Sequence, residues 1–204
     1  MYTPLCVHIK GISPQIMSNG QMVDVLNRFS KKLKEYTSKR KKTDEDYIAM
    51  MEWEFKGSLY CFRDDDDGPP YWPAENIHAC LKDAAKERKL GKTFDKAVLV
   101  EPPGGQVIYD GPRTREGLWN DERFRLVKKV VRQRASIISC RPIFNKWEMK
   151  FNLNVLEEKV NKEDVVSVIR DAGRFVGLST WRPRYGLFEL TAVEEKHGKL
   201  NFGV

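Results

Sequence analysis

The sequence predicts an α+β fold with an antiparallel sheet and helices on one face. Strand patterns stand at both ends of the chain, and each is followed by a helix pattern and a further strand. Near the N-terminus, Leu5, Val7 and Ile9 alternate with polar residues over 5–11. Near the C-terminus, the strand–helix–strand order spans 147–194. Such units indicate a ferredoxin-like (RRM-like) core.

The first third adds a loop, a basic segment and a helix. Residues 12–21 are rich in turn formers, and residues 23–42 carry eight Lys and Arg against Asp24 and Glu35. Thr43 precedes three acids, which suit the first turn of a helix, so a helix is predicted over 43–56. Residues 58–62 predict a strand, and these elements would form a βαβ unit with the first strand.

The middle of the chain predicts one helix and a basic insertion. Ile77, Leu81, Ala84 and Ala85 recur at helical spacing within 74–89. Residues 101–120 are broken by Gly and Pro and predict mostly loop. Residues 123–141 hold seven basic residues and no acid, which predicts a basic strand or hairpin. We therefore expect a single domain over 1–204 with an insertion at 91–145.

The last third is the most regular. Trp147, Met149, Phe151, Leu153 and Val155 share one face of a predicted strand. A helix is expected after an Asn161 N-cap, with Asp164 at its third position and Gly177 at C′. Residues 178–186 predict a loop and 187–194 a closing strand. The buried stripe expected for the helix is Val165, Val168, Ile169, Ala172 and Phe175.

Candidates for catalysis are weak. Asp64–Asp67 is either a metal cluster or a solvated turn, and the turn is favoured because adjacent Asp side chains diverge and "GPP" follows. His8, His78 and His197 lack a spaced partner, and the four cysteines form no CxxC pair. The sequence predicts no catalytic residue, no metal site and no cofactor, so it does not compel an enzyme.

Composition bears on location and partners. The formal charge of +7 favours a polyanionic partner. The N-terminus lacks a signal-peptide pattern and no apolar run approaches 18 residues, so a cytoplasmic protein with no membrane partner is expected. In "STWRPRYG", aromatic rings interleave with guanidinium groups, as stacking on unpaired bases requires. The predicted nucleic-acid-binding residues are Lys39, Arg40, Lys41, Lys42, Lys128, Lys129, Arg132, Arg134, Arg141, Trp181, Arg182, Arg184 and Tyr185.

Three stretches resemble the RAMP superfamily, the repeat-associated proteins of CRISPR effector backbones and processing enzymes. "GPPYWPAENIHACLKDAA" is similar to their strand-to-helix signature through Gly68, Tyr71, Pro73, Ile77 and Leu81, with Lys82 where the family has an arginine. "IKGISPQIMSNG" resembles their first strand and loop. "GRFVGLSTWRPRYGLFEL" resembles their C-terminal glycine-rich loop at Gly177, Gly186 and Phe188. The chain looks like a compact, stand-alone phage or prophage member.

The resemblance implies a ferredoxin-like core that binds single-stranded RNA near 177–186, with self-association along the strand in many members. Ala74 and Ala79 replace family glycines and His78 replaces a lysine. These departures argue against close backbone approach at that helix. The catalytic set of the processing members has no counterpart here, so cleavage is not carried over.

Three functions follow in order. The leading hypothesis is non-catalytic binding of single-stranded nucleic acid, RNA ahead of DNA. The second is a metal-dependent nuclease that uses Asp64–Asp67 with His78. The third is an interaction protein of a mobile element, whose basic face meets an acidic protein such as a host effector complex.

Overall fold

The computed structural model describes residues 1–62, 68–132 and 135–195, with the backbone alone at 131, 132, 135 and 136. Within these residues the main sheet has six strands, and every neighbouring pair is antiparallel. β1 (Tyr2–Gly11) lies between β8 (Glu148–Leu156) and β9 (Phe188–Glu195). The other side of β8 carries β4 (Val98–Val100) and β5 (Gly104–Ile108), and β3 (Tyr71–Pro73) pairs with β5.

The main sheet and its helices form a ferredoxin-like core, as predicted. The chain runs through β1, α3 (Ala74–Glu87), the pair β4 and β5, then β8, α6 (Lys162–Asp171) and β9. These are two interleaved βαβ units, each with a strand of the other between its own strands. α3 and α6 contact each other and bury their apolar stripes with alternate residues of β1 and β8. α4 (Gly91–Ala97) follows α3 and leads into β4.

The C-terminal helix confirms its predicted cap and corrects one core residue. The Asn161 side chain accepts a hydrogen bond from the Asp164 N–H at 2.7 Å, and Gly177 follows with φ of +80°. Phe175 was expected in the buried stripe but is 43% exposed. The reason is that the chain continues as a π-helix, η3 (Ala172–Val176), whose wider turn rotates Phe175 out of the stripe.

The predicted βαβ unit at the N-terminal end is wrong in its helix and second strand. The helix exists as α2 (Asp44–Ser58), with the expected Thr43 cap, but it lies outside the main sheet. Residues 58–62 form no strand beyond one isolated bridge between Cys61 and Pro70. The first core helix is α3, which follows the short edge strand β3 directly and contacts α6. Gly57 and Ser58 read as a helix end in the sequence, yet both lie within α2.

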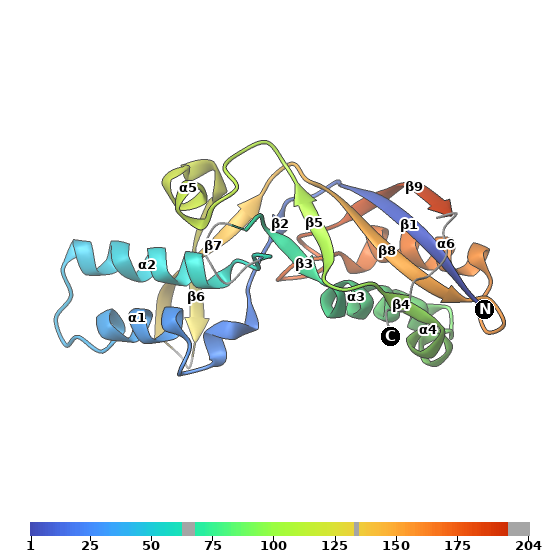
Figure 1. Ribbon diagram of the computed structural model, residues 1–204. Helices are drawn as coiled ribbons and strands as arrows, with labels where there is room; N and C mark the ends of the chain where they lie inside the picture. Colours follow the sequence, from blue (N-terminus) through green and yellow to red (C-terminus); the bar gives the residue numbers. More distant parts are fainter. Residues whose placement is uncertain (63–67, 133–134, 196–204) are drawn as a thin grey trace, which may run out of the picture.

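A second, smaller part holds the insertions. Its sheet has the order β2–β7–β6, made by β2 (Gln15–Ile16), β7 (Ala135–Phe144) and β6 (Arg125–Arg132). The hairpin of β6 and β7 confirms the predicted basic hairpin. α1 (Arg28–Thr37) packs beside α2, and α2 packs on β7, at the end of the molecule opposite α4 and α6 (Figure 1). Short helices η1 (Gly20–Val23), α5 (Arg115–Asn120) and η2 (Glu122–Phe124) complete this part.

The predicted loop over 101–120 is corrected by β5 and α5. β5 begins at Gly104, whose φ of +122° suits glycine. A Cβ at this position would lie 2.0 Å from the Trp72 carbonyl oxygen. Gly104, which the sequence places in a loop, therefore allows β5 to lie close to β3. Within the predicted insertion 91–145, β4 and β5 belong to the main sheet.

Candidate nucleic-acid interface

The β6–β7 hairpin presents lysines along an edge strand. β6 pairs with β7 alone among the described strands, so its outer backbone edge faces away from the sheet. Lys128 and Lys129 lie near the middle of β6, opposite Ser139 and Ile138. No carboxylate of the described residues forms an ion pair with either lysine, whereas Arg123 pairs with Asp121 and Arg125 with Glu122. The acids that pair with Arg123 and Arg125 thus lie within three residues before them in the chain.

The loop over 177–186 is hydrogen-bonded to β2 and to Pro14 just before it. The Leu178 N–H donates to the Gly186 carbonyl at 2.8 Å, which closes the loop at its base. The Gly186 N–H donates to the Pro14 carbonyl, and the Thr180 N–H donates to the Ile16 carbonyl. The buried Ser179 hydroxyl accepts from the Ile16 N–H at 2.8 Å. Since β2 also pairs with β7, this strand connects the loop to the hairpin.

Together these elements build one shallow groove of about 280 Å³, which we call the cation groove. Residues from two predicted site segments, more than 50 positions apart in the chain, meet in it. The rings of Trp181 and Tyr185 lie 6.2 Å apart and tilted by 55°. Trp181 is 39% exposed. The groove is lined by Lys128, Lys129, Val130, Trp181, Arg184 and Tyr185.

Trp181 has an unusual backbone. Its φ of +62° lies in the left-handed region, which costs an ordinary L-residue about 1–2 kcal/mol. Bulky residues adopt this conformation rarely, and such strain is concentrated at functional sites. An exposed aromatic residue in a strained conformation therefore needs an explanation other than core packing. With 39% of its surface exposed, Trp181 is also not an anchor of the core.

The remaining predicted site residues lie elsewhere. Arg182 lines a separate polar hollow of about 250 Å³ and approaches Asp83 at 3.5 Å. Lys39 is paired with Asp46 at 2.6 Å, and Lys42 lines a third, apolar groove. Arg40 and Lys41 are exposed in the α1–α2 loop and line neither the cation groove nor the polar hollow. The Arg132 side chain and all of Arg134 lie outside the described residues.

Arg141 is occupied internally. Its guanidinium donates to the hydroxyls of Ser18 and Ser58 and lies 3.2 Å from a Glu54 carboxylate oxygen. Glu54 in turn accepts from Ser139 Oγ and the Cys140 N–H. This network joins α2 to β7. It gives the Arg141 guanidinium an internal carboxylate partner, whereas the sequence predicts that Arg141 binds a phosphate. Arg141 therefore differs from Lys128 and Lys129, which form no ion pair within the part of the chain that the structure describes.

The sequence did not anticipate how the loop is positioned. Gln15 and Ile16 were expected in a turn-rich loop, but they form the strand that carries the loop over 177–186. Gln15 is fully buried and its amide donates to the Leu178 carbonyl. A two-residue strand is too short for alternation to reveal it. Only the pairing partners, distant in sequence, define β2.

The open face of the main sheet offers no comparable platform. RRM domains bind single strands through aromatic residues on this face. Here the corresponding central positions of β1 and β8 point away from the core and are polar or small. They are Cys6, His8, Lys10, Lys150, Asn152 and Asn154. The aromatic surface that could stack on bases lies instead in the cation groove.

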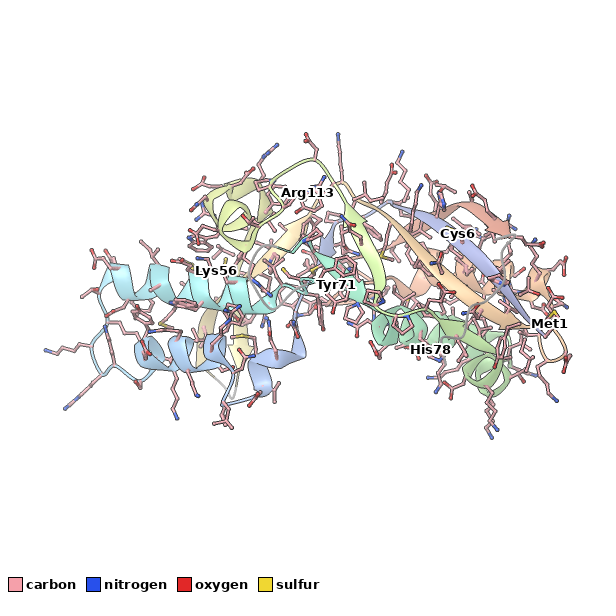
Figure 2. All side chains as sticks on the ribbon, viewed as in Figure 1. Met1, Cys6, Lys56, Tyr71, His78 and Arg113 are labelled. Atoms are coloured by element: carbon pink, nitrogen blue, oxygen red, sulfur yellow. The ribbon has the colours of Figure 1, made fainter. Side chains whose placement is uncertain are left out.

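The nuclease candidates are not assembled in the described part of the chain. His78 projects from α3 (Figure 2). It hydrogen-bonds Asp95 at 3.0 Å, and Lys82 pairs with the same carboxylate at 2.8 Å. The contacts with Lys82 and, second, with His78 lower the pKa of Asp95. Over residues 1–62, 68–132 and 135–195, no three His, Cys, Asp or Glu side chains converge as metal ligands. Asp64–Asp67 and His197 lie outside the described residues. No helix in the described ranges has the length and apolar character needed to cross a membrane.

Comparison with known proteins finds similarity among solved structures and none among sequence families. No protein-family model matches the chain, and no curated protein sequence matches it. Among solved structures, the chain is similar to a chain of the type III-B Cmr-beta complex bound to cognate target RNA. The two share 16% identity with a TM-score of 0.41, over 95% of this chain and 60% of that one. The chain thus spans about three fifths of the length of that protein.

Proposed function

We propose that this protein binds single-stranded nucleic acid without cleaving it, and that the cation groove is the binding site. One observation carries the proposal: the groove combines two lysines that form no ion pair with described residues, an arginine and two aromatic rings. Cations neutralise phosphates, and aromatic rings stack on bases that are not paired. Few other ligands require both features in one shallow, open groove.

The proposed contacts divide by chemistry. Lys128, Lys129 and Arg184 contact phosphates, because each is exposed and has no ion pair among the described residues. Trp181 and Tyr185 stack on one or two bases, at about 1–3 kcal/mol for each stacked base. The strained backbone of Trp181 is then the cost of holding its ring toward the strand. A duplex, whose bases are already stacked, would lose this second group of contacts.

RNA is preferred over DNA in this proposal. The preference rests on the resemblance of the glycine-rich loop and the strand-to-helix segment to the RAMP superfamily. The loop over 177–186 has the two glycines of that resemblance at positive φ, at Gly177 and Gly186. A direct contact to a 2′-hydroxyl would distinguish the two polymers. Self-association along a strand belongs to the same proposal.

The test is fluorescence anisotropy with labelled single-stranded RNA, single-stranded DNA and duplex at several salt concentrations. The assay is run with and without Mg²⁺, and the recovered strand is examined on a gel. We expect salt-dependent binding to single strands, RNA ahead of DNA, with the strand intact. Equal or tighter binding to duplex would contradict the stacking role of the aromatic pair. Cleaved strand in Mg²⁺ would contradict the non-catalytic proposal.

A further inference from the structure

A second groove, independent of the cation groove, lies between α1, α2 and β7. We call it the apolar groove, and its volume is about 630 Å³. This is within the usual range for built binding pockets, about 300–1,000 Å³. Its apolar walls come from three separate elements and leave large side chains open to solvent. They are Leu33, Tyr47, Met50, Met51, Ile137 and Ile138.

The exposed apolar side chains of this groove are neighbours of one another. Ile138 is 56% exposed, and Tyr47 and Ile137 are also exposed, although all three lie beside half-buried Leu33, Met50 and Met51. Single exposed apolar residues are normal on a protein surface, but a contiguous hollow of them marks an interaction site. Methionine side chains adapt to partners of different shape, and they are frequent at such surfaces.

The wall on α2 has the geometry of a helix-packing surface. Tyr47, Met50, Met51 and Glu54 follow the i, i+3, i+4, i+7 spacing, so they form one row along the helix. A ridge of side chains on a second helix packs into such a row. Peptide helices that bind in grooves use anchors at the same spacing. The shape therefore fits an amphipathic helix.

The charge around the groove specifies the polar face of that helix. Glu54 lies in the row, but its carboxylate is already satisfied by Arg141, Ser139 and the Cys140 N–H. Among the described lining residues, Lys42 is the one charged group without an ion pair, and its ammonium donates to the Lys39 carbonyl at 2.7 Å. Over 28–42 the chain holds eight Lys and Arg and one acid.

We propose that the apolar groove binds an acidic amphipathic helix of a partner protein. Apolar anchors of that helix would cover Met50, Met51 and Ile138, and its acids would face the cations of α1 and the α1–α2 loop. A nucleic acid fits this groove less well, because its floor offers apolar side chains to a strongly hydrated polymer. This proposal adds a protein partner to the proposed nucleic-acid binding. The apolar groove and the cation groove have no lining residue in common.

The probe is a labelled synthetic helix of about 18 residues, long enough for isolated helicity. It carries Leu at i, i+3, i+4 and i+7 spacing and Glu on the opposite face. Two matched peptides serve as controls: one with Lys in place of Glu, and one of the same composition with the leucines rearranged to break the apolar stripe. Binding is measured by anisotropy at low and high salt, because charge contacts weaken with ionic strength.

Variants locate the site. Ile138→Asp places a charge among the apolar lining residues, and we expect it to weaken binding of the acidic helix by about tenfold or more. Ile48→Asp is the matched control. Ile48 lies on α2, which lines the groove, and is 53% exposed, but its own side chain does not line the groove. This control should stay within about twofold of the unsubstituted chain. Ile138→Ser tests the same position without adding a charge, and circular dichroism confirms that each variant is folded.

The outcomes separate the possible occupants. Binding of the acidic stripe peptide alone, lost in Ile138→Asp and kept in Ile48→Asp, supports the proposal. Equal binding of all three peptides, or of none, overturns it. A dimer in sedimentation analysis that Ile138→Asp dissociates would assign the groove to a second copy of the chain. Loss of RNA binding in Ile138→Asp with no effect on peptide would assign it to nucleic acid, and both results overturn the proposal.

Discussion

Lys129 of β6 and Ile138 of β7 lie directly opposite each other in the hairpin, yet they line different grooves. Lys129 lines the cation groove together with Trp181, whereas Ile138 lines the hollow beside α1 and α2. The two strands of one hairpin therefore serve two surfaces of opposite chemistry. Substitution of a solvent-exposed side chain on one strand should affect one surface and leave the other intact.

Replacement of Lys128 and Lys129 by Ala should weaken RNA binding and flatten its salt dependence. Each phosphate neutralised on a single strand contributes about 0.7 to the magnitude of the log–log salt slope. If each lysine neutralises one phosphate, the magnitude of the slope should fall by about 1.4. The measurement is the anisotropy titration repeated at several salt concentrations. The matched control is Lys146→Ala with Lys159→Ala, which removes the same charge from exposed lysines outside the groove. An equal change in both double variants would mean that only overall charge matters.

Replacement of Trp181 by Ala should weaken binding without changing the salt slope. The expected loss is about 1–3 kcal/mol, the usual value for one base stacked on a ring. Binding should also quench the fluorescence of Trp181, because Trp181 is the one tryptophan among the described residues that line the groove. The Trp181→Phe variant keeps a ring and should retain most of the affinity. A reduced slope in Trp181→Ala would show that the ring acts by positioning cations.

The strain at Trp181 makes a separate prediction about stability. Trp181→Gly should be more stable than Trp181→Ala by about 1 kcal/mol, because glycine adopts a φ of +62° without steric cost. Chemical denaturation of both variants measures the difference in the free energy of unfolding. Both variants lose the ring, so their affinities for RNA should be equal. Equal stabilities would show that this φ is not strained in solution.

The network around Glu54 predicts a structural effect for Arg141. Arg141→Met should lower the free energy of unfolding by about 2–3 kcal/mol, because it leaves the mostly buried Glu54 carboxylate without its charged partner. Lys32→Met, which breaks the exposed pair with Glu35, should change it by less than about 1 kcal/mol. At a temperature where both variants are folded, the RNA salt slope should match that of the unsubstituted chain. A flatter slope for Arg141→Met alone would restore the phosphate contact predicted from the sequence.

The predictable part of the fold is the part with regular periodicity. The alternation over 147–155 and the Asn161 cap were enough to predict β8 and α6, and their order with β1 predicts the ferredoxin-like core. The assignment of α2 failed because a capped helix followed by an apolar stretch has the same local pattern inside or outside the core. Which sheet it packs on depends on β7, about 85 residues away in the chain.

The candidate site was predictable in its residue types and not in its assembly. Lys128, Lys129, Trp181, Arg184 and Tyr185 were chosen from local charge and aromatic content, and the structure brings them into one groove. Arg141 was chosen for the same reason, but its acid partner comes from α2, and no local pattern shows such a pairing. The apolar groove has no local signal at all, because Leu33, Met50 and Ile138 come from three elements.

The ion pair at the start of α2 predicts a stability that depends on pH. Asp46 accepts a hydrogen bond from the Lys39 ammonium at 2.6 Å and another from the Thr43 N–H at 3.0 Å. These contacts, the ammonium first, lower the pKa of Asp46 below its ordinary value of 3.8. The unfolded chain therefore binds a proton at a higher pH than the folded chain does. The stabilisation is complete above the ordinary pKa and is lost as the pH falls through the lowered folded value.

Asp46→Asn tests this prediction, because asparagine keeps an oxygen for the cap but no charge for Lys39. The difference in the free energy of unfolding between the unsubstituted chain and Asp46→Asn should be largest near neutral pH. It should shrink as urea unfolding is repeated at successively lower pH values below the ordinary pKa of 3.8, because Asp46 becomes protonated as the pH falls through its lowered value. The control is Asp24→Asn, because the Asp24 carboxylate accepts a hydrogen bond from the Leu26 N–H and has no ion pair with a described residue, so the charge effect should be smaller. A difference that stays constant over the whole range would mean that the Lys39 contact does not stabilise the fold.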